Sequence, residues 1–127
     1  QLKAFAPVTK DFEAADISLV AISLDTADGL QKSLTTSGIE GGYPFPLLSD
    51  RSMKIFKAYR AFDDFEDMPL HGTFLIDEEG MIRWQDISYQ PFEDTGFVLK
   101  EAQRLLNQTK APILAKDRGV KRFLSAR

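Results

Sequence analysis

The hydrophobic and polar positions of this chain fall into blocks that predict helices and strands in alternation. Near-helical spacing of apolar side chains predicts an amphipathic helix over residues 1–14, in which Pro7 should kink the helix or loosen one turn. Residues 17–24 form an almost unbroken apolar and β-branched run, which is typical of a strand covered on both faces. A second helix follows, for which Asp25 and Thr26 supply an N-cap.

The middle of the chain predicts a loop, a short strand and a third helix. Residues 38–46 hold three glycines and two prolines and must form a loop. A short strand over 46–48 follows, and then Ser49 or Asp50 caps the next helix. The acidic residues of 63–67 carry hard ligands for calcium or magnesium, yet their spacing matches no EF-hand loop. We therefore expect a solvated loop there and no metal site.

The last third of the chain predicts a β-hairpin followed by a helix. Strands over 73–76 and 81–87 enclose a turn in which Gly80 provides the positive φ that a tight turn needs. Trp84 on the second strand should pack on the sheet against the final helix, residues 92–106. The resulting order of helices and strands is an α/β arrangement around a small mixed sheet.

Length and composition predict one domain with an acidic body. A chain of 127 residues with 43% hydrophobic content can bury one core, and we expect a single domain over residues 1–107. That part carries 10 basic and 18 acidic side chains, whereas residues 108–127 carry 6 basic and 1 acidic and should form a basic tail or linker. The net charge of −3 argues against general nucleic-acid binding, and no apolar run is long enough for a membrane helix.

No cysteine occurs in the chain, and this limits its chemistry more than any other feature. Disulfides, zinc–thiolate sites and thiol nucleophiles are excluded within these 127 residues. The sequence also has no phosphate-binding glycine loop, nucleophile elbow or HExxH motif. The chain opens inside a predicted helix and without methionine, so we interpret it as a fragment of a longer protein. Its compartment stays open, with the cytoplasm favoured because no targeting signal is visible.

Three segments together resemble one family. These are QLKAFAPVTKDFEAADISLVAISLD, YPFPLLSDRSMKIFKAY and the hairpin LHGTFLIDEEGMIRW. In this order they are similar to redoxin domains of the alkyl hydroperoxide reductase/thiol-specific antioxidant (AhpC/TSA) branch of the thioredoxin superfamily, over residues 1 to about 107. The resemblance implies a thioredoxin-like α/β fold, in which helices form layers on both sides of a mixed sheet. The strand that precedes the cysteine helix in this fold is missing here. Either the sheet repacks, or a partner or the segment Ala111–Leu114 fills its place, or the chain belongs to a longer parent.

The resemblance implies antioxidant, thiol-dependent oxidoreductase chemistry for the longer protein. That parent would be a peroxidase or a thioredoxin-like disulfide reductase, which acts on a peroxide or a disulfide with a thiol reductant and without a cofactor. His71 stands where peroxiredoxins often carry an arginine that stabilises the cysteine thiolate, so it is the candidate for an auxiliary catalytic residue. Its alternative role is that of a hydrogen-bonded residue at a strand end. Gly72, Thr73 and Pro69 are candidates for the substrate pocket.

Two hypotheses stay open at this point. The first is an enzyme fragment, which is inactive as given because the nucleophile is absent. A homodimer is one assembly to consider for this enzyme. The second is a cysteine-free module of redoxin fold that binds a partner or serves as a scaffold. A CxxC or TxxC sequence upstream of Gln1 would favour the enzyme. The enzyme hypothesis also requires that the start of the first helix and His71 share one cleft.

Overall fold

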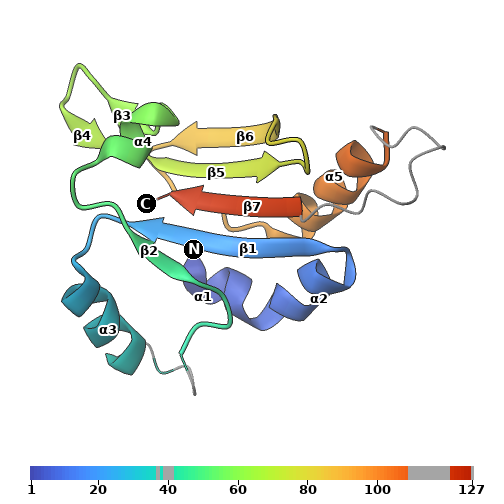
Figure 1. Ribbon diagram of the computed structural model, residues 1–127, viewed down its shortest axis with the longest axis horizontal. Coiled ribbons are helices and arrows are strands. Elements are labelled where there is room, and N and C mark those ends of the chain that lie inside the picture. The colour runs from blue at the N-terminus through green and yellow to red at the C-terminus, as the bar shows by residue number, and fades with distance from the viewer. Residues whose placement is uncertain (37, 39–41, 109–120, 127) are drawn as a thin grey trace.

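A five-stranded mixed sheet forms the centre of the molecule. The computed structural model describes residues 1–36, 38, 42–108 and 121–126 (Figure 1). The strand order in the sheet is β2-β1-β7-β5-β6. Its strands are β1 (Ile17–Ser23), β2 (Leu47–Ser49), β5 (His71–Ile76), β6 (Ile82–Ser88) and β7 (Lys121–Ala126). The chain between them forms the helices α1 (Leu2–Phe5), η1 (Ala6–Val8, a 3-10 helix), α2 (Thr9–Ala14), α3 (Ala27–Thr36), α4 (Lys54–Ala58) and α5 (Thr95–Gln108), and a separate two-stranded ribbon of β3 (Phe62–Asp63) and β4 (Met68–Pro69).

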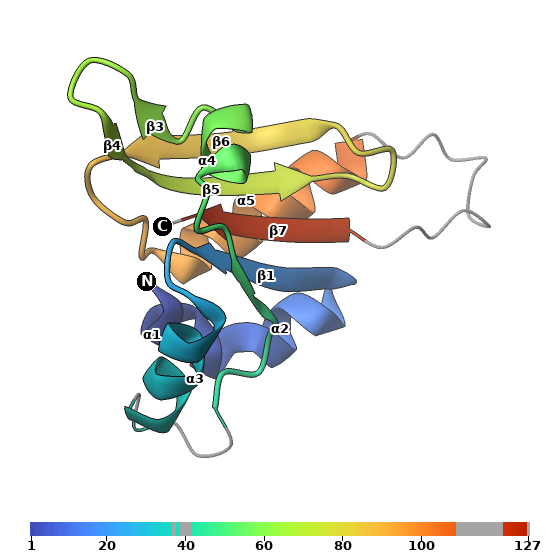
Figure 2. The same ribbon diagram turned by 60° about the vertical axis from the view of Figure 1, so that its left-hand side comes forward.

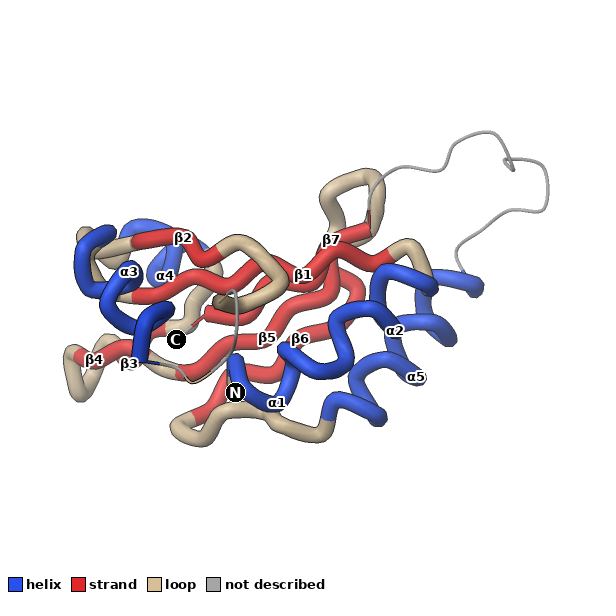
Figure 3. Tube along the Cα trace, turned by 90° about the horizontal axis from the view of Figure 1, so that it is seen from below, coloured by secondary structure: helices blue, strands red, loops and turns tan. Residues whose placement is uncertain are grey.

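Helices cover both faces of the sheet, as Figures 2 and 3 show. On one face lie α1, α2 and α5, where Phe12 and Val98 pack with Leu75 of β5 in the larger apolar core. On the opposite face lies α4, where Phe56 packs with Phe74 in a second core. Successive residues of β5 therefore serve different cores, because side chains alternate across a strand. The predicted thioredoxin-like α/β fold is confirmed.

The first helical segment is interrupted where the sequence predicts it. Pro7 lies in the 3-10 helix η1, which separates α1 from α2. A proline has no N–H to donate and its ring crowds the preceding turn, so a tighter local helix replaces the α-helical turn. The apolar spacing around it still holds, because Phe5 and Phe12 both reach the larger core with their ring centroids 5.8 Å apart.

The first helix cap and the hairpin turn also follow the prediction. The hydroxyl of Thr26 accepts a hydrogen bond from the N–H of Gly29 at the start of α3. The N-cap residue of α4 is Met53, and not the predicted Ser49 or Asp50. The buried carboxylate of Asp50 still accepts the N–H groups of Ile55 and Phe56 at 2.8 and 2.9 Å, as a cap would. In the turn between β5 and β6, Gly80 has a φ of +83°.

The gap in the sheet is filled by the chain itself. β7 lies between β1, to which it is parallel, and β5, to which it is antiparallel. The filling strand is Lys121–Ala126, whereas the predicted candidate, Ala111–Leu114, lies outside the described residues. Residues 121–126 thus belong to the sheet, although the segment 108–127 is predicted as a tail or linker.

A second difference concerns the predicted acidic loop. Its ends pair as the short strands β3 and β4, in which Phe62 is opposite Pro69 and Asp63 is opposite Met68. Two-residue strands have no period that a sequence pattern could reveal. The carboxylate of Asp63 accepts the N–H groups of Phe65 and Glu66 and so holds the turn between the two strands.

Candidate active site

The candidate site lies at the edge of the sheet where two parallel strands end and β5 begins. Ala126, the last residue of β7, pairs with Ile22 of β1 on one side and with Gly72 of β5 on the other. The carboxyl ends of β1 and β7 therefore meet the start of β5 at His71. In open α/β sheets, ligands bind in the crevice outside the carboxyl ends of the parallel strands.

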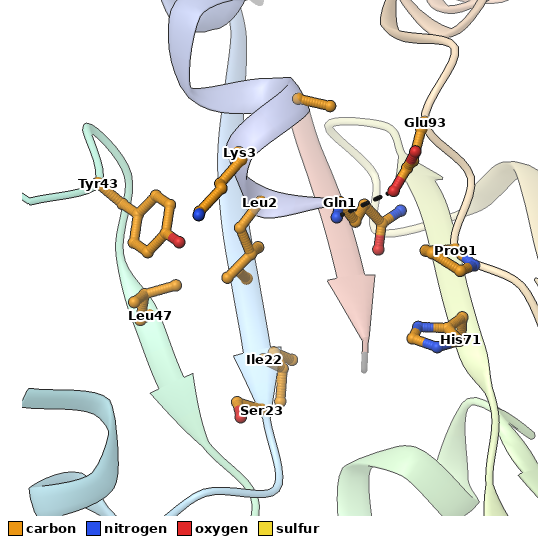
Figure 4. A pocket seen from close by; sticks show the side chains of 12 residues that line it. Gln1, Leu2, Lys3, Ile22, Ser23, Tyr43, Leu47, His71, Pro91 and Glu93 are labelled. Carbon is orange, nitrogen blue, oxygen red and sulfur yellow. Dashed lines mark hydrogen bonds and ion pairs between the residues drawn. The ribbon is translucent and has the colours of Figure 1, made fainter. Parts of the chain in front are cut away.

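A cavity of about 630 Å³ opens at this edge and contains both the start of the first helix and His71 (Figure 4). Gln1 and Lys3 contribute from the helix, and Ile22 and Ser23 from the end of β1. The other lining residues are Leu2, Ala4, Ala21, Tyr43, Leu47, Pro91 and Glu93. The enzyme hypothesis requires such a shared cleft, and this requirement is met.

Gln1 joins three separate segments at the back of the cavity. Its side-chain amide donates hydrogen bonds to the hydroxyl of Thr73 at 2.7 Å and to the carbonyl of Phe92 at 2.9 Å. These contacts hold the first turn of α1 against β5, the strand that begins at His71, and against the loop before α5.

His71 is half-buried at the first position of β5 and is paired with Ser88 of β6. Its Nδ1 atom is shielded from solvent. The imidazole lines the large cavity and also a second, neighbouring cavity of about 300 Å³. His71 and Ser23 are the two residues common to both cavities.

The predicted pocket residues take different positions around this histidine. Pro69 lines only the second cavity, together with Leu70, Leu24 and Asp25. Thr73 is buried and reaches the site through Gln1, without lining either cavity.

Gly72 also lines neither cavity, because it faces the α4 side of the sheet. A Cβ atom at this position would lie 2.6 Å from the ring of Phe74 and 3.1 Å from Cβ of Ala61. The reason for glycine is therefore close packing under α4, and the glycine affects the site only through the backbone.

The residues that sequence reasoning missed lie far from His71 along the chain. Gln1, Ser23 and Glu93 enter the site through the topology of the sheet, and Gln1 and Thr73 are 72 positions apart. The sequence did contain a signal for one of these residues, Ser23. Ser23 ends a predicted buried strand, and polar residues at the carboxyl ends of parallel strands are recurrent site residues.

A tyrosine–carboxylate hydrogen bond joins the β3–β4 ribbon to the end of β6. The hydroxyl of Tyr89 donates a short hydrogen bond to the carboxylate of Asp63. This bond lowers the pKa of Asp63, with help from the N–H groups of Glu66 and Phe65. The same bond raises the pKa of the Tyr89 phenol. Tyr89 directly follows the residue that pairs with His71, so the ribbon is tied to the strand that borders the site.

Two further classes of site can be checked in the described part of the chain. Nowhere in residues 1–36, 38, 42–108 and 121–126 do three histidine, aspartate or glutamate side chains come together as metal ligands would. Every helix in the same ranges is too short or too polar to cross a bilayer.

The fold and the site define a class of protein. A mixed sheet with helices on both faces, and a cavity where the central strands meet the start of an antiparallel hairpin, is the architecture of a thioredoxin-like domain. The sequence model of the AhpC/TSA family matches residues 1–85. The chain belongs to the AhpC/TSA family, as a peroxiredoxin-like redoxin domain.

Individual relatives agree with this assignment. The chain is 29% identical to Peroxiredoxin 2 of Thermoplasma acidophilum over an alignment of 107 residues. This alignment covers 81% of this chain and 51% of the relative. It is 29% identical to the mitochondrial thioredoxin-dependent peroxide reductase of Drosophila melanogaster over 109 residues, and this alignment covers 84% of this chain and 45% of the relative. The solved structure of Mycobacterium tuberculosis AhpC superposes with a TM-score of 0.73 at 19% identity, over 87% of this chain and 62% of that one, and it supports the fold. The chain spans about half the length of the curated relatives that it matches.

Proposed function

We propose that this chain forms one wall of the active site of a thiol-dependent peroxidase, and that the nucleophilic cysteine comes from a segment outside these 127 residues. One observation carries the proposal. The start of α1 and His71 line one cavity at the end of the central strands, and Gln1 holds them together through Thr73. The resemblance of this hairpin to the family supports a thiolate-stabilising role for His71.

The chemistry can be written for a thiolate delivered into this cavity. The thiolate attacks one oxygen of a peroxide, the O–O bond breaks, and an alkoxide or hydroxide leaves and takes up a proton. The sulfur becomes a sulfenic acid, a second thiol condenses with it and releases water, and a dithiol reductant restores the thiol. In this scheme an imidazolium at His71 would lower the pKa of the attacking thiol and favour the thiolate.

The reductant in this proposal is a protein of the thioredoxin type. The Drosophila relative is named a thioredoxin-dependent peroxide reductase, and this name is the support for extending that donor to the present chain. Because a cysteine-free chain has no thiol for either step, the 127-residue chain alone should be inactive.

The test compares this chain with the complete product of the open reading frame that contains it. Loss of hydrogen peroxide is followed with dithiothreitol as the electron donor. The complete product should consume peroxide, and the 127-residue chain should match the buffer blank. Peroxide consumption by the chain alone would refute the proposal, and so would inactivity of a complete product that carries a cysteine ahead of Gln1.

The role of His71 has its own test in the complete product. His71→Gln removes the charge and keeps a hydrogen-bonding side chain, whereas His71→Arg supplies the residue that peroxiredoxins often carry there. We expect His71→Gln to raise the pKa of the reactive thiol, read from the pH dependence of its alkylation, and His71→Arg to leave it low. An unchanged pH profile in His71→Gln would show that the histidine is structural.

The second candidate function is a cysteine-free binding or scaffold module, and the observation that favours it is the absence of cysteine from the chain. The same open reading frame decides between the two. A complete product without cysteine ahead of Gln1 would have the fold and the cavity but no thiol chemistry. In that case the cavity would serve as a recognition surface.

A further inference from the structure

The β3–β4 ribbon, residues 62–69, presents apolar side chains to solvent at one end of the molecule. Phe65 at the tip of the turn is 93% exposed, and Met68 on β4 is 41% exposed. Tyr89, which is tied to the ribbon through Asp63, is 61% exposed. We call these three residues the apolar tip. Several exposed apolar side chains on one short segment are a feature of interaction sites.

The ribbon holds this tip in a defined conformation. Asp63 accepts the N–H groups of Phe65 and Glu66 at 2.9 and 3.0 Å, and its other oxygen accepts the Tyr89 hydroxyl. Next to this turn, the ammonium group of Lys57 lies 4.7 Å from the ring centre of Phe62 and anchors the base of the ribbon to α4. A tip that is already ordered loses little conformational entropy when it binds, and this saving increases affinity.

The charge around the tip restricts what can bind there. Four carboxylates, those of Asp63, Asp64, Glu66 and Asp67, lie within the five residues from 63 to 67. Nucleic acid and anionic lipid would be repelled by this group. A protein surface with an apolar recess bordered by lysine or arginine is complementary to the apolar tip in both hydrophobicity and charge.

The ribbon also stands at the rim of the candidate active site. Pro69 ends β4 and lines the second cavity, and the next two residues, Leu70 and His71, line it as well. On the neighbouring strand, Tyr89 follows the residue that pairs with His71. Figures 1 and 2 show β3 and β4 at the end of the sheet to which β7 points. A protein that brings a thiol to the cavity beside His71 would therefore lie within reach of the tip.

The other exposed apolar side chains do not share this position. Leu48, which is 45% exposed, lies on the edge strand β2, separated from β5 by β1 and β7. Met81 and Ile82 lie at the turn between β5 and β6, at the far end of the same hairpin from His71. Phe97 packs with Trp84 and Phe92 beside α5. Only the apolar tip, among the described residues, combines high exposure, a fixed turn, negative charge and proximity to the cavity.

We infer that the apolar tip docks the protein reductant of this site, a thioredoxin-type protein whose active-site face has an apolar surface bordered by basic side chains. This inference rests on the proposed function, since it names the surface through which that reductant would be recognised. A peroxide needs no such surface, because a small molecule enters the cavity directly.

The first experiment measures binding with the 127-residue chain, which contains the whole tip and no reactive thiol. The probe is a reduced thioredoxin that carries lysine beside its active site, titrated into ¹⁵N-labelled chain. We expect shifts of the amide signals of residues 62–70 and 89. Phe65→Ser should weaken binding at least about tenfold, as loss of a central aromatic anchor does. The matched control, Met81→Ser, removes an exposed apolar side chain at the other end of the hairpin and should bind like the parent chain.

The electrostatic part of the inference is tested in the same titration. Replacing Asp64 and Glu66 by Asn and Gln should weaken binding and reduce its dependence on salt, because screened charges contribute less as ionic strength rises. Equal affinity of Phe65→Ser and the parent chain, shifts confined to other residues, or no binding by the parent chain would overturn the inference. Binding of the parent chain to zwitterionic vesicles that is lost in Phe65→Ser would assign the tip to membranes and overturn it as well.

The second experiment separates the docking inference from the proposed function. The complete product of the open reading frame is assayed with dithiothreitol and with thioredoxin. If Phe65→Ser raises the KM for thioredoxin about tenfold and leaves the dithiothreitol-supported rate unchanged, the tip acts in docking. An unchanged KM for thioredoxin in an active enzyme overturns the docking inference alone. Inactivity with both donors overturns the proposed function, and the docking inference with it.

Discussion

Replacing Gly72 by alanine tests whether close packing, and not substrate binding, determines this residue. A Cβ atom at position 72 would lie 2.6 Å from Cε2 of Phe74, about 1 Å inside an ordinary carbon–carbon contact. The ring cannot easily move away, because Phe74 is 1% exposed and meets the ring of Tyr59 at a centroid distance of 5.0 Å. Overpacking of this kind costs about 1–3 kcal/mol, and the reduced freedom of the unfolded chain returns about 0.4–1 kcal/mol. We therefore expect Gly72→Ala to lower the free energy of unfolding by about 1–2 kcal/mol.

The measurement is urea unfolding followed by the fluorescence of Trp84, the single tryptophan of the chain. Gly96→Ala is the matched control, because its Cβ would have no neighbour closer than 3.7 Å, and this variant should be neutral or more stable. Phe74→Leu makes room under Gly72, so the double variant Gly72→Ala/Phe74→Leu should be more stable than the sum of the single changes predicts. The packing argument is refuted if Gly72→Ala unfolds within about 0.5 kcal/mol of the parent chain.

Three further predictions concern a cap, a tether and a strand. Asp50→Ala should lower the free energy of unfolding by about 1–3 kcal/mol in the same urea assay, because a buried and a partly buried N–H group of α4 lose their acceptor, and Asp50→Asn should cost less. The Tyr89 phenol should ionise above its ordinary pKa of 10.0 in an absorbance titration, and Asp63→Asn should bring it back. Because the pKa of Asp63 is lowered in the folded chain, its hydrogen bond to Tyr89 should be fully present above the ordinary pKa of 3.8. The bond should be lost as the pH falls through the lower folded-state pKa, and the amide signals of the ribbon should shift in that pH range. A chain that ends at Gln108 loses β7 and leaves the facing edges of β1 and β5 unpaired, so cooperative unfolding by circular dichroism should disappear.

The sequence predicts those parts of the fold that depend on neighbouring residues. The turn between β5 and β6 forms because Asp77 accepts the N–H groups of Glu79 and Met81 and Gly80 takes a positive φ. Pro7 interrupts the first helix for an equally local reason. Trp84 packs against Phe92 and Phe97 as predicted, since it lies on the hairpin beside the final helix.

The parts that the sequence does not predict depend on distant pairing. β7 begins with two charged residues, Lys121 and Arg122, and such a start is typical of a solvated tail. It becomes a central strand because β1 and β5 each offer a free edge to it, and those edges belong to segments far back in the chain. No periodicity within residues 108–127 contains this information. The β3–β4 ribbon is missed for a different reason, because two-residue strands are held by the turn at Asp63 and not by an apolar pattern.

The candidate site shows the same division between local and distant information. His71 could be named from the sequence, because the hairpin that carries it resembles the family in consecutive residues. Gln1 could not, since its role depends on hydrogen bonds to Thr73 and Phe92 that only the folded chain brings within reach. Resemblance therefore locates one wall of the cavity, and the topology of the sheet provides the opposite wall.

The central strand connects the stability of the domain with the integrity of the site. Ala126 pairs with Ile22 on one side and with Gly72 on the other. Ile22 directly precedes Ser23, and Gly72 directly follows His71. Ser23 and His71 are the two residues that line both cavities. The separation of the two walls is therefore set by the width of one strand between β1 and β5. If β7 leaves its place, Ser23 and His71 lose their common support and the cavity loses its shape. A strand in this place that is parallel to β1 and antiparallel to β5 satisfies the backbone groups of both neighbours, so the shape of the cavity depends on this pairing.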